Sequence, residues 1–231
     1  MTFVLLFMLA IRFFACYNGA KRGNETMTQY HVRHVDHMEN IDWQCVPMAG
    51  LTNFLWLDNG FCPPTFAQLA WTNDALAVRL FSHEAHPVRT LTHHQDMVCM
   101  DSCLEFFVNF MPVQTTQFFN FEVNPNGAML SAFGPPRDGR TPLDLTHWAK
   151  EMHITPVVQE GLGWGVTYQI PWRLVAEFEP GFVPEKDRVI VGNFFKCGEN
   201  APVPHYGTWN RIDVAQVNFH RPEFFAPLIF D

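Results

Sequence analysis

Carboxylate and amide side chains recur at alternate positions in two segments near the middle of the chain. Glu105 lies in the first, residues 101–109, and Glu122 and Asn124 lie in the second, residues 118–127. Alternate residues of a β-strand point to opposite faces, so each segment predicts a strand with one apolar and one polar face. Two such strands side by side would display a row of hydrogen-bonding groups opposite an aromatic core. The chemistry predicted for this row is the binding of a polar ligand.

Histidine clusters offer a second kind of chemistry, which is metal binding. Three imidazoles recur at helical spacing in residues 31–37, and further pairs lie in residues 83–86 and 93–94. Two or three such groups could hold zinc or copper, but no carboxylate or thiolate stands at a spacing that completes a known site. Solvated surface histidines are the favoured interpretation, and metal ligands are left unassigned. His205 is separate, because a neutral imidazole there could hydrogen-bond a hydroxyl group.

The polar row needs a sheet to hold it, and frequent turn signals after residue 40 predict one. Strands are expected at residues 65–71, 75–82, 101–109, 118–124, 128–133, 152–159, 164–170, 188–196 and 224–230. Arg79 is expected on the outer face of its strand. A Pro/Gly/Arg loop is expected at residues 135–142, followed by polar residues to Lys150, and a short helix is expected after Pro171. This pattern predicts an all-β chain, an antiparallel β-sandwich of jelly-roll or immunoglobulin-like type with one short helix.

Size and composition fit one such domain, predicted to span residues 27–231. Only 16% of the residues are charged, which argues against a disordered chain, and 15% are aromatic, which is enough to build a core from large rings. The formal net charge of -8 comes without a basic cluster, so no nucleic-acid partner is expected. The six cysteines are irregularly spaced and include no Cys-x-x-Cys pair, which favours buried free thiols in a reducing compartment.

Residues 1–26 are interpreted as an extension outside the fold, either a mis-assigned start or a weak anchor. Their apolar run, residues 2–17, has no positive residue ahead of it and is interrupted by Arg12. It is too short to span a bilayer comfortably and lacks the charged start of a secretory signal. The segment that starts at Met27 is more typical of the start of a protein. A cytoplasmic protein is favoured, and a secreted or lipid-anchored one is expected if residues 1–26 are a real signal.

Six segments appear in order over roughly residues 40–231. They are Trp71-Thr-Asn-Asp-Ala-Leu-Ala-Val-Arg79, Asp101-Ser-Cys-Leu-Glu105, Phe121-Glu-Val-Asn-Pro-Asn-Gly127, Ile170-Pro-Trp-Arg-Leu174, Asn193-Phe-Phe-Lys-Cys-Gly198 and His205-Tyr-Gly-Thr-Trp209. Together they resemble the family-9 carbohydrate-binding module, and more closely its family-9-like branch of stand-alone proteins. The resemblance implies an antiparallel β-sandwich that holds the end of a sugar chain between two Trp rings, with calcium as a structural ion.

Matched residue by residue, the resemblance places the later of the two clamp Trp residues on Trp209. The acidic residue of the first polar strand falls on Glu105, and a position that is Arg in a sugar-binding member is Glu122 here. The first clamp Trp should lie shortly before Asp101, where the chain has Val98-Cys-Met100 instead. Half of the aromatic clamp is therefore missing.

A pyranose needs an aromatic face for its C–H patches and oriented donors and acceptors for its hydroxyl groups. Trp209 is expected to supply the face. The expected rim consists of Glu105, Glu122, Asn124, Arg79, Lys196 and His205, and a structural calcium could draw on Asp96, Asp101 and Glu105. The alternative is that the polar row is only the wet side of a sheet, with Arg79 paired to Glu105 across strands.

Three functions stay open. The favoured one is non-catalytic binding of a small carbohydrate, without enzyme activity and in possible association with a glycan-processing enzyme. The second is a glycoside hydrolase that uses Glu105 and Glu122, which requires carboxyl groups about 5–5.5 Å or about 6.5–9.5 Å apart. The third is haem binding through Met and His, as in related cytochrome-type β-sandwich domains.

Overall fold

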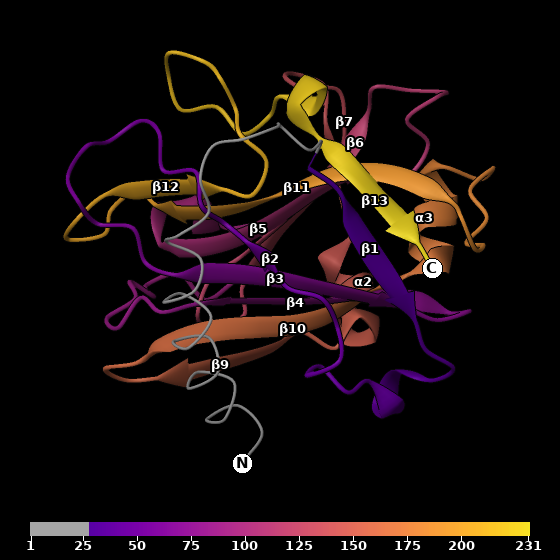
Figure 1. Cartoon of the computed structure of the whole chain (residues 1–231), viewed down its shortest axis with the longest axis horizontal. Coiled ribbons are helices and arrows are strands. Elements are labelled where there is room, and N and C mark those ends of the chain that lie inside the picture. The colour runs from indigo at the N-terminus through magenta and orange to yellow at the C-terminus, as the bar shows by residue number, and fades with distance from the viewer. Residues whose placement is uncertain (1–27) are drawn as a thin grey trace.

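The computed structural model describes residues 28–231, which form mainly β-strands (Figure 1). The strands are β1 (Tyr30–His34), β2 (Ala49–Gly50), β3 (Thr65–Trp71), β4 (Ala75–Ser82), β5 (Ser102–Asn109), β6 (Phe118–Val123), β7 (Met129–Gly134), β8 (Thr141–Pro142), β9 (Thr155–Gln159), β10 (Gly163–Pro171), β11 (Val189–Gly198), β12 (His205–Thr208) and β13 (Ala226–Phe230). The helices are α2 (Leu145–Met152) and α3 (Trp172–Phe178), with 3-10 turns η1 (Met38–Asn40), η2 (Val98–Met100) and η3 (Pro222–Phe224). The predicted all-β class is confirmed.

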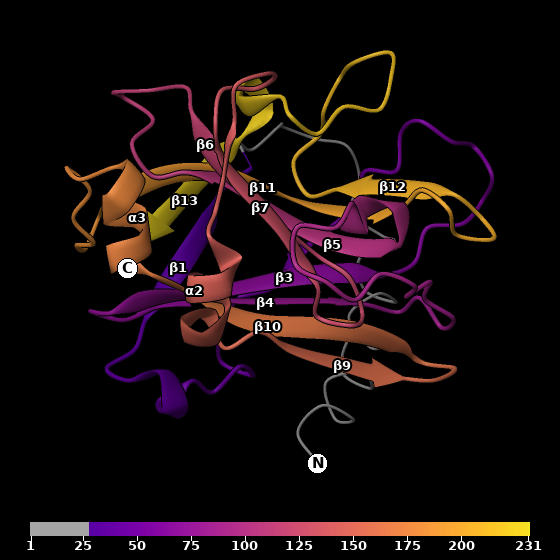
Figure 2. The same ribbon diagram turned by 180° about the vertical axis from the view of Figure 1, so that it is seen from behind.

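The strands of the described part form one hydrogen-bonded sheet of 13 strands. Its order is β8-β7-β6-β5-β11-β13-β1-β3-β4-β10-β9, with β12 paired to β11 and β2 to β3. Because β1 pairs with β13 on one side and β3 on the other, the two halves form a single curled sheet (Figures 1 and 2). Both pairings of β1 are parallel, which corrects the purely antiparallel prediction. The long connection of residues 35–64 turns the chain back so that β3 runs in the direction of β1. The jelly-roll or immunoglobulin-like type stays a prediction.

The two halves of the sheet face each other across the main core. Phe106 of β5 stacks on Phe194 of β11 with ring centroids 4.9 Å apart. Phe121 of β6 lies 6.1 Å from Tyr168 of β10, which belongs to the opposite half. Burial of side chains of this kind stabilises the fold by about 1.5–3 kcal/mol each. The residues predicted to face inward therefore hold the two halves together.

The outer faces of both halves are covered as well. Residues of the 209–225 segment, including Phe219 and Phe225, pack against β5 and β11 in a second hydrophobic cluster. Residues 35–46 cover part of β3 and β4 in the same way, and Arg79 is consequently only 3% exposed. The alternative interpretation, in which the polar row is only the wet side of a sheet, is therefore wrong, since Glu105, Glu122 and Asn124 are buried. Period-two alternation assigns residues to faces, but it does not reveal which faces a distant segment will cover.

Helix α2 corrects the prediction of a single short helix, because the polar residues before Lys150 were given no helix. The Asp144 side chain accepts a hydrogen bond from the Thr146 backbone N–H at the start of α2, which is the contact of a helix N-cap. Leu145, Trp148 and Met152 lie on the buried face of this helix. The predicted helix after Pro171 is confirmed as α3. Figures 1 and 2 show both helices toward the end of the sheet that lies away from β12.

The described cysteines Cys45, Cys62, Cys99, Cys103 and Cys197 are free thiols. Among residues 28–231, no helix has the length and apolar character needed to cross a membrane. The predictions for residues 1–26, including their apolar run, fall outside the described residues.

Candidate functional site

Two carboxylates lie directly opposite each other on the outer face of β5 and β6. The strand register pairs Glu105 with Glu122, and the two residues are 2% and 5% exposed. Directly opposite residues of an antiparallel pair have Cβ atoms about 4.5–5.5 Å apart. We call this pair, with Asn120 beside it, the acidic face. The sequence prediction that both glutamates share one face is confirmed.

Hydrogen bonds compensate the acidic face only in part. Asn120 donates from Nδ2 to Oε1 of Glu122 at 3.0 Å, and Arg140 donates from Nη2 to Oδ1 of Asn120 at 2.7 Å. None of the ion pairs formed within residues 28–231 includes Glu105 or Glu122. The acidic face therefore has amide donors close to it but no cation in direct contact.

Burial sets the protonation of this pair. It raises the pKa of Glu122 to about 7, against the opposing effects of the Asn120 hydrogen bond and the Arg140 charge. Burial, followed by the charge of Glu122, raises the pKa of Glu105 well above its usual value, against the opposing effects of the Lys196 charge and a hydrogen bond with Cys103. Two carboxylates in one site resist simultaneous ionisation, so the acidic face holds a proton near neutral pH. It can thus both accept and donate hydrogen bonds.

Aromatic side chains border the acidic face on the same side of the sheet. Phe195, which pairs with Glu105 across the strands, stacks on Phe219 with ring centroids 4.4 Å apart. Trp56 lies 5.8 Å from Phe219 and donates from its indole N–H to the Val214 carbonyl. Trp56 and Tyr206 are both partly exposed. These rings were missed from the sequence, because the 51–62 loop carrying Trp56 gives no periodic signal.

Trp209 does not lie beside the acidic face. It belongs to the main core and is 9% exposed. Its ring meets Tyr30 edge-on at 6.4 Å and Phe194 at 5.4 Å. Phe194 is on the inner side of β11, whereas its neighbour Phe195 belongs to the second cluster on the outer side. The structure thus separates the predicted aromatic platform from Glu105 by the thickness of the sheet.

Lys196 and His205 also turn inward, toward a residue that the sequence analysis did not select. Lys196 Nζ lies 3.0 Å from Oε2 of Glu84, and His205 Nε2 lies 3.8 Å from Oε1 of the same carboxylate. Ser102 and Trp164 donate hydrogen bonds to Glu84 at 2.7 and 2.9 Å. We call these five residues the Glu84 network. All of them are buried.

The Glu84 network is compensated internally. Burial alone would raise the pKa of Glu84, but the Lys196 charge and the hydrogen bonds from Ser102 and Trp164 bring it below its usual value. Burial and the nearby Lys196 charge lower the pKa of His205 to about 4, so its imidazole is neutral at pH 7. The network therefore contains an ionised pair in the interior.

The Asn124 side chain holds a loop in place through hydrogen bonds. Its Nδ2 donates to the Leu91 carbonyl at 2.8 Å and to Oδ2 of Asp101 at 2.9 Å. Asp101 in turn accepts hydrogen bonds from the backbone N–H groups of Thr90 and Leu91. These contacts tie the loop before η2 to the end of β6.

Arg79 lies in the other half of the sheet. Its strand β4 pairs with β3 and β10, so the predicted cross-strand pairing with Glu105 is wrong. The guanidinium lies 5.5 Å from the centre of the Trp43 ring, and burial lowers its pKa to about 10. Of the seven predicted site residues, the structure brings only Glu105 and Glu122 together on the acidic face.

No group of three or more His, Cys, Asp or Glu side chains arranged to hold a metal ion is found within residues 28–231. The predicted contributors to a calcium site do not converge there, since Asp101 binds the Thr90 and Leu91 backbone. A structural calcium ion stays a prediction from the resemblance.

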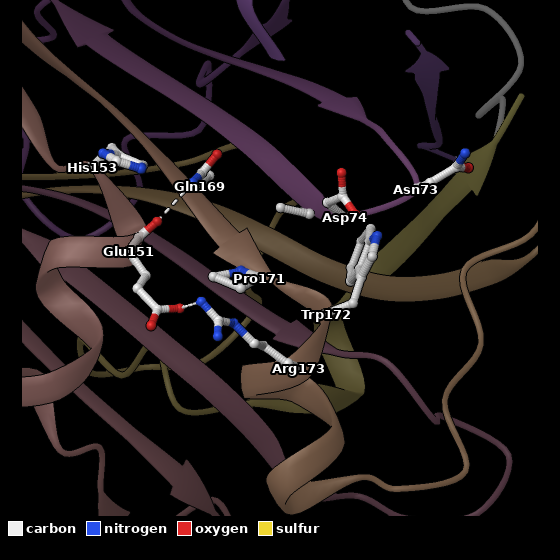
Figure 3. A pocket seen from close by; sticks show the side chains of 9 residues that line it. Asn73, Asp74, Glu151, His153, Gln169, Pro171, Trp172 and Arg173 are labelled. Carbon is white, nitrogen blue, oxygen red and sulfur yellow. Dashed lines mark hydrogen bonds and ion pairs between the residues drawn. The ribbon is translucent and has the colours of Figure 1, made fainter. Parts of the chain in front are cut away.

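A cavity of about 490 Å³ opens where β4 begins and β10 ends (Figure 3). We call it the β10 pocket. It was not predicted, although the Trp71–Arg79 and Ile170–Leu174 segments meet there. Its lining residues are Asn73, Asp74, Ala75, Glu151, His153, Gln169, Pro171, Trp172 and Arg173. These residues supply two carboxylates, two amides, an imidazole and a guanidinium. The pocket is more accessible than the acidic face, because Asp74, His153 and Arg173 are exposed.

The fold has relatives among solved structures. A protein from Bacteroides uniformis, provisionally described as carbohydrate-binding, superposes with a TM-score of 0.74 at 23% identity over 89% of this chain and 100% of its own. A family-9 carbohydrate-binding module from Caldicellulosiruptor kristjanssonii, solved with cellotriose, gives a TM-score of 0.59 at 12% identity over 88% of this chain and 93% of its own. The same kind of module from that organism, solved with glucose, gives 0.58 at 12% identity over 88% and 96%.

A search of curated proteins finds no match. A family model described as carbohydrate-binding family 9 matches residues 16–230, which is nearly the whole chain. The family suggested by the six sequence segments is therefore confirmed, and the chain belongs to carbohydrate-binding family 9.

Proposed function

We propose that the protein binds a small carbohydrate without chemically altering it, and that the acidic face is the site. The observation that carries this proposal is the pair of buried carboxylates, Glu105 and Glu122, neither of which forms an ion pair within residues 28–231. Burying ionisable groups without a partner costs stability. Carboxyl groups with strongly shifted pKa values are typical of functional sites.

The chemistry of the acidic face suits hydroxyl groups. A carboxylate accepts strong hydrogen bonds from O–H donors, and a protonated carboxyl donates one as well. Trp56 and Tyr206, partly exposed beside the same cluster, would supply the flat apolar surface that Trp209 cannot offer. The relatives solved with glucose and cellotriose support a sugar as ligand.

We expect binding rather than hydrolysis. Hydrolysis requires a carboxylate on each side of the scissile bond and room for a sugar between them. Glu105 and Glu122 project side by side from directly opposite positions of adjacent strands, so both would lie on the same side of a bound sugar. The solved relatives are described as binding proteins or modules. A cytoplasmic location and association with a glycan-processing enzyme stay predictions.

The test is calorimetric titration of the full chain with glucose and cellotriose. We expect saturable binding that weakens about tenfold or more in Glu105→Gln and in Glu122→Gln, because each loses a carboxyl group that hydrogen-bonds a sugar hydroxyl. Glu39→Gln, at an exposed residue of η1, is the matched control and should bind normally. Absence of binding across a broad sugar array would refute the proposal. Release of nitrophenol from nitrophenyl glycosides, lost in Glu122→Gln, would favour the hydrolase instead.

A further inference from the structure

The β10 pocket is built on a rigid floor. Pro171 and Ala75 are opposite each other where β10 and β4 end their pairing. The Trp172 backbone N–H donates to the Asp74 carbonyl at 2.9 Å, and its indole N–H donates to the Thr72 carbonyl at 2.8 Å. The Trp172 ring is therefore fixed in place. Trp172 belongs to the main core and is 8% exposed, so only the part of its ring that lines the pocket beside Pro171 is open to a ligand.

One wall of the pocket carries a pair of opposite charges. The Arg173 guanidinium forms an ion pair with the Glu151 carboxylate and lies 5.5 Å from the centre of the Trp148 ring. Gln169 donates from Nε2 to the Glu151 backbone carbonyl at 2.7 Å. Figure 3 shows the Glu151, Gln169 and Arg173 side chains projecting from α2, β10 and α3 around Pro171. Donors and acceptors thus stand at set positions before any ligand arrives.

The Asp74 side chain remains available for a ligand. It follows the exposed Asn73 in the turn between β3 and β4. The turn is held by its backbone, because the Asp74 N–H donates to Thr72 Oγ1 at 3.1 Å. Within residues 28–231, no hydrogen bond or ion pair occupies the Asp74 carboxylate. A carboxylate held in this way can accept hydrogen bonds from ligand hydroxyl groups.

The balance of charge identifies the class of ligand. Asp74 and Glu151 carry negative charge, Arg173 carries positive charge, and Arg173 is already paired with Glu151. Arg173 is the one Arg or Lys of the lining and is already paired, and neutral hydroxyl groups match the remaining acceptors and amides. The volume of about 490 Å³ lies within the range of small-molecule sites. The Trp172 and Pro171 rings would meet the C–H face of a ring.

We propose that the β10 pocket is a second binding site, specific for a neutral polyhydroxylated ring such as a single sugar residue. It is independent of the acidic face, which lies on β5 and β6 in the other half of the sheet. The protein would then engage two sugar residues at separate places on one domain. Asp74 and Gln169 provide hydrogen bonds, and Trp172 and Pro171 provide the apolar contact.

Fluorine NMR of the full chain labelled with 5-fluorotryptophan tests this proposal. The probes are glucose, galactose and xylose, with glycine and inorganic phosphate as a zwitterion and an anion for comparison. The Trp172 and Trp56 signals, assigned by Trp172→Phe and Trp56→Phe, report on the two sites separately. We expect saturable movement of the Trp172 signal with at least one sugar and none with glycine or phosphate. Asp74→Asn and Gln169→Ala should each weaken this response about tenfold.

The exposed Asp138→Asn serves as the matched control and should leave the Trp172 response unchanged. Glu105→Gln should abolish or weaken the Trp56 response while the Trp172 response persists, which would establish two independent sites. Loss of the Trp172 response in Glu105→Gln would mean a single site at the acidic face and would overturn the inference. So would a Trp172 signal unmoved by all three sugars, a preference for glycine or phosphate, or equal affinity in Asp74→Asn and Gln169→Ala.

Discussion

The two buried acidic regions of this molecule differ in the partners that surround their carboxylates. In the Glu84 network, a lysine and two uncharged donors surround one carboxylate, and the pKa of Glu84 falls below its usual value. On the acidic face, two carboxylates face each other without a cation in contact, and burial raises their pKa values. Both regions are equally hidden from solvent. They differ in whether the fold itself supplies the partners.

This difference separates a structural role from a binding role. A carboxylate whose hydrogen-bonding capacity is filled by the fold has little left for a ligand. A carboxylate pair that is buried but undersupplied with donors gains most when donors from a ligand arrive. Lys196 and His205 therefore belong to the structural region, and Glu105 and Glu122 to the proposed site. The following predictions test that division.

The largest effect is expected from breaking the Glu84 network. Lys196→Met would leave the Glu84 carboxylate buried without its cation, and removal of one member of a buried ion pair costs about 3–5 kcal/mol. Urea denaturation followed by circular dichroism should show this loss in the free energy of unfolding. The double variant Glu84→Gln/Lys196→Met removes both charges and should recover much of it. A loss below about 1 kcal/mol in Lys196→Met would show that the pair is not buried as described.

The acidic face should make the stability of the protein fall as the pH rises. The pKa of Glu122 is about 7 in the folded protein and 4.5 as its ordinary value, so the folded state holds the proton more tightly. Stability from this group is complete below pH 4.5 and is lost as the pH rises toward 7. Integrated over that window, a shift of this size corresponds to about 3 kcal/mol.

Glu122→Gln isolates this contribution. The stability difference between variant and wild type should move in favour of the variant by about 3 kcal/mol between pH 4 and pH 8. Comparison at each pH cancels the contributions of Glu179, whose pKa burial raises to about 7, and of His220, whose pKa burial lowers to about 4. A difference that does not change with pH would mean that Glu122 ionises freely, and the acidic face would lose its distinction from the surface.

The tryptophans sharpen the comparison further. Trp209→Phe shortens a ring in the main core and should lower the free energy of unfolding by about 1–2 kcal/mol without changing sugar affinity. Trp56→Leu keeps an apolar side chain but removes the flat ring beside the acidic face, so sugar affinity should fall about fivefold. Calorimetric titration and urea denaturation of both variants measure the two effects. The opposite assignment of effects would return the binding platform to Trp209.

Local patterns predicted the strands and their faces well. Residues 65–71 and 75–82 were predicted with the bounds that β3 and β4 have, because alternation and turn residues are local signals. The same alternation put Glu105 and Glu122 on one face. Helix α2 was missed because one buried face made of Leu145, Trp148 and Met152 is a weak pattern in a short polar segment.

Two features could not be predicted from the sequence: which distant segments cover each face of the sheet, and which residues pair with each buried charge. Whether Glu105 faces water depends on the 209–225 segment, which packs over the outer face from far along the chain. The partner of Lys196 is Glu84, in a loop after β4 that has no periodic signal. Trp209 follows β12 and enters the main core, although its neighbour Tyr206 faces the second cluster. These placements follow from tertiary packing, which local spacing does not encode.

The smallest predicted effect uses Cys99 as a reporter of charge on the acidic face. Burial, followed by the charges of Glu122 and Glu105, raises the pKa of this partly exposed thiol to about 12. Only the thiolate reacts with iodoacetamide, so Glu122→Gln should lower the pKa and accelerate alkylation of Cys99 about two- to threefold at pH 8. Mass spectrometry of the alkylated peptides measures the rate, with the exposed Cys62 as internal reference. If Glu122→Gln changes neither the Cys99 nor the Cys62 alkylation rate, Glu122 carries no charge in the wild-type protein at pH 8, although this pH is far above the ordinary pKa of a glutamate. The acidic face would then remain protonated well above neutrality and would bind its ligand as a hydrogen-bond donor.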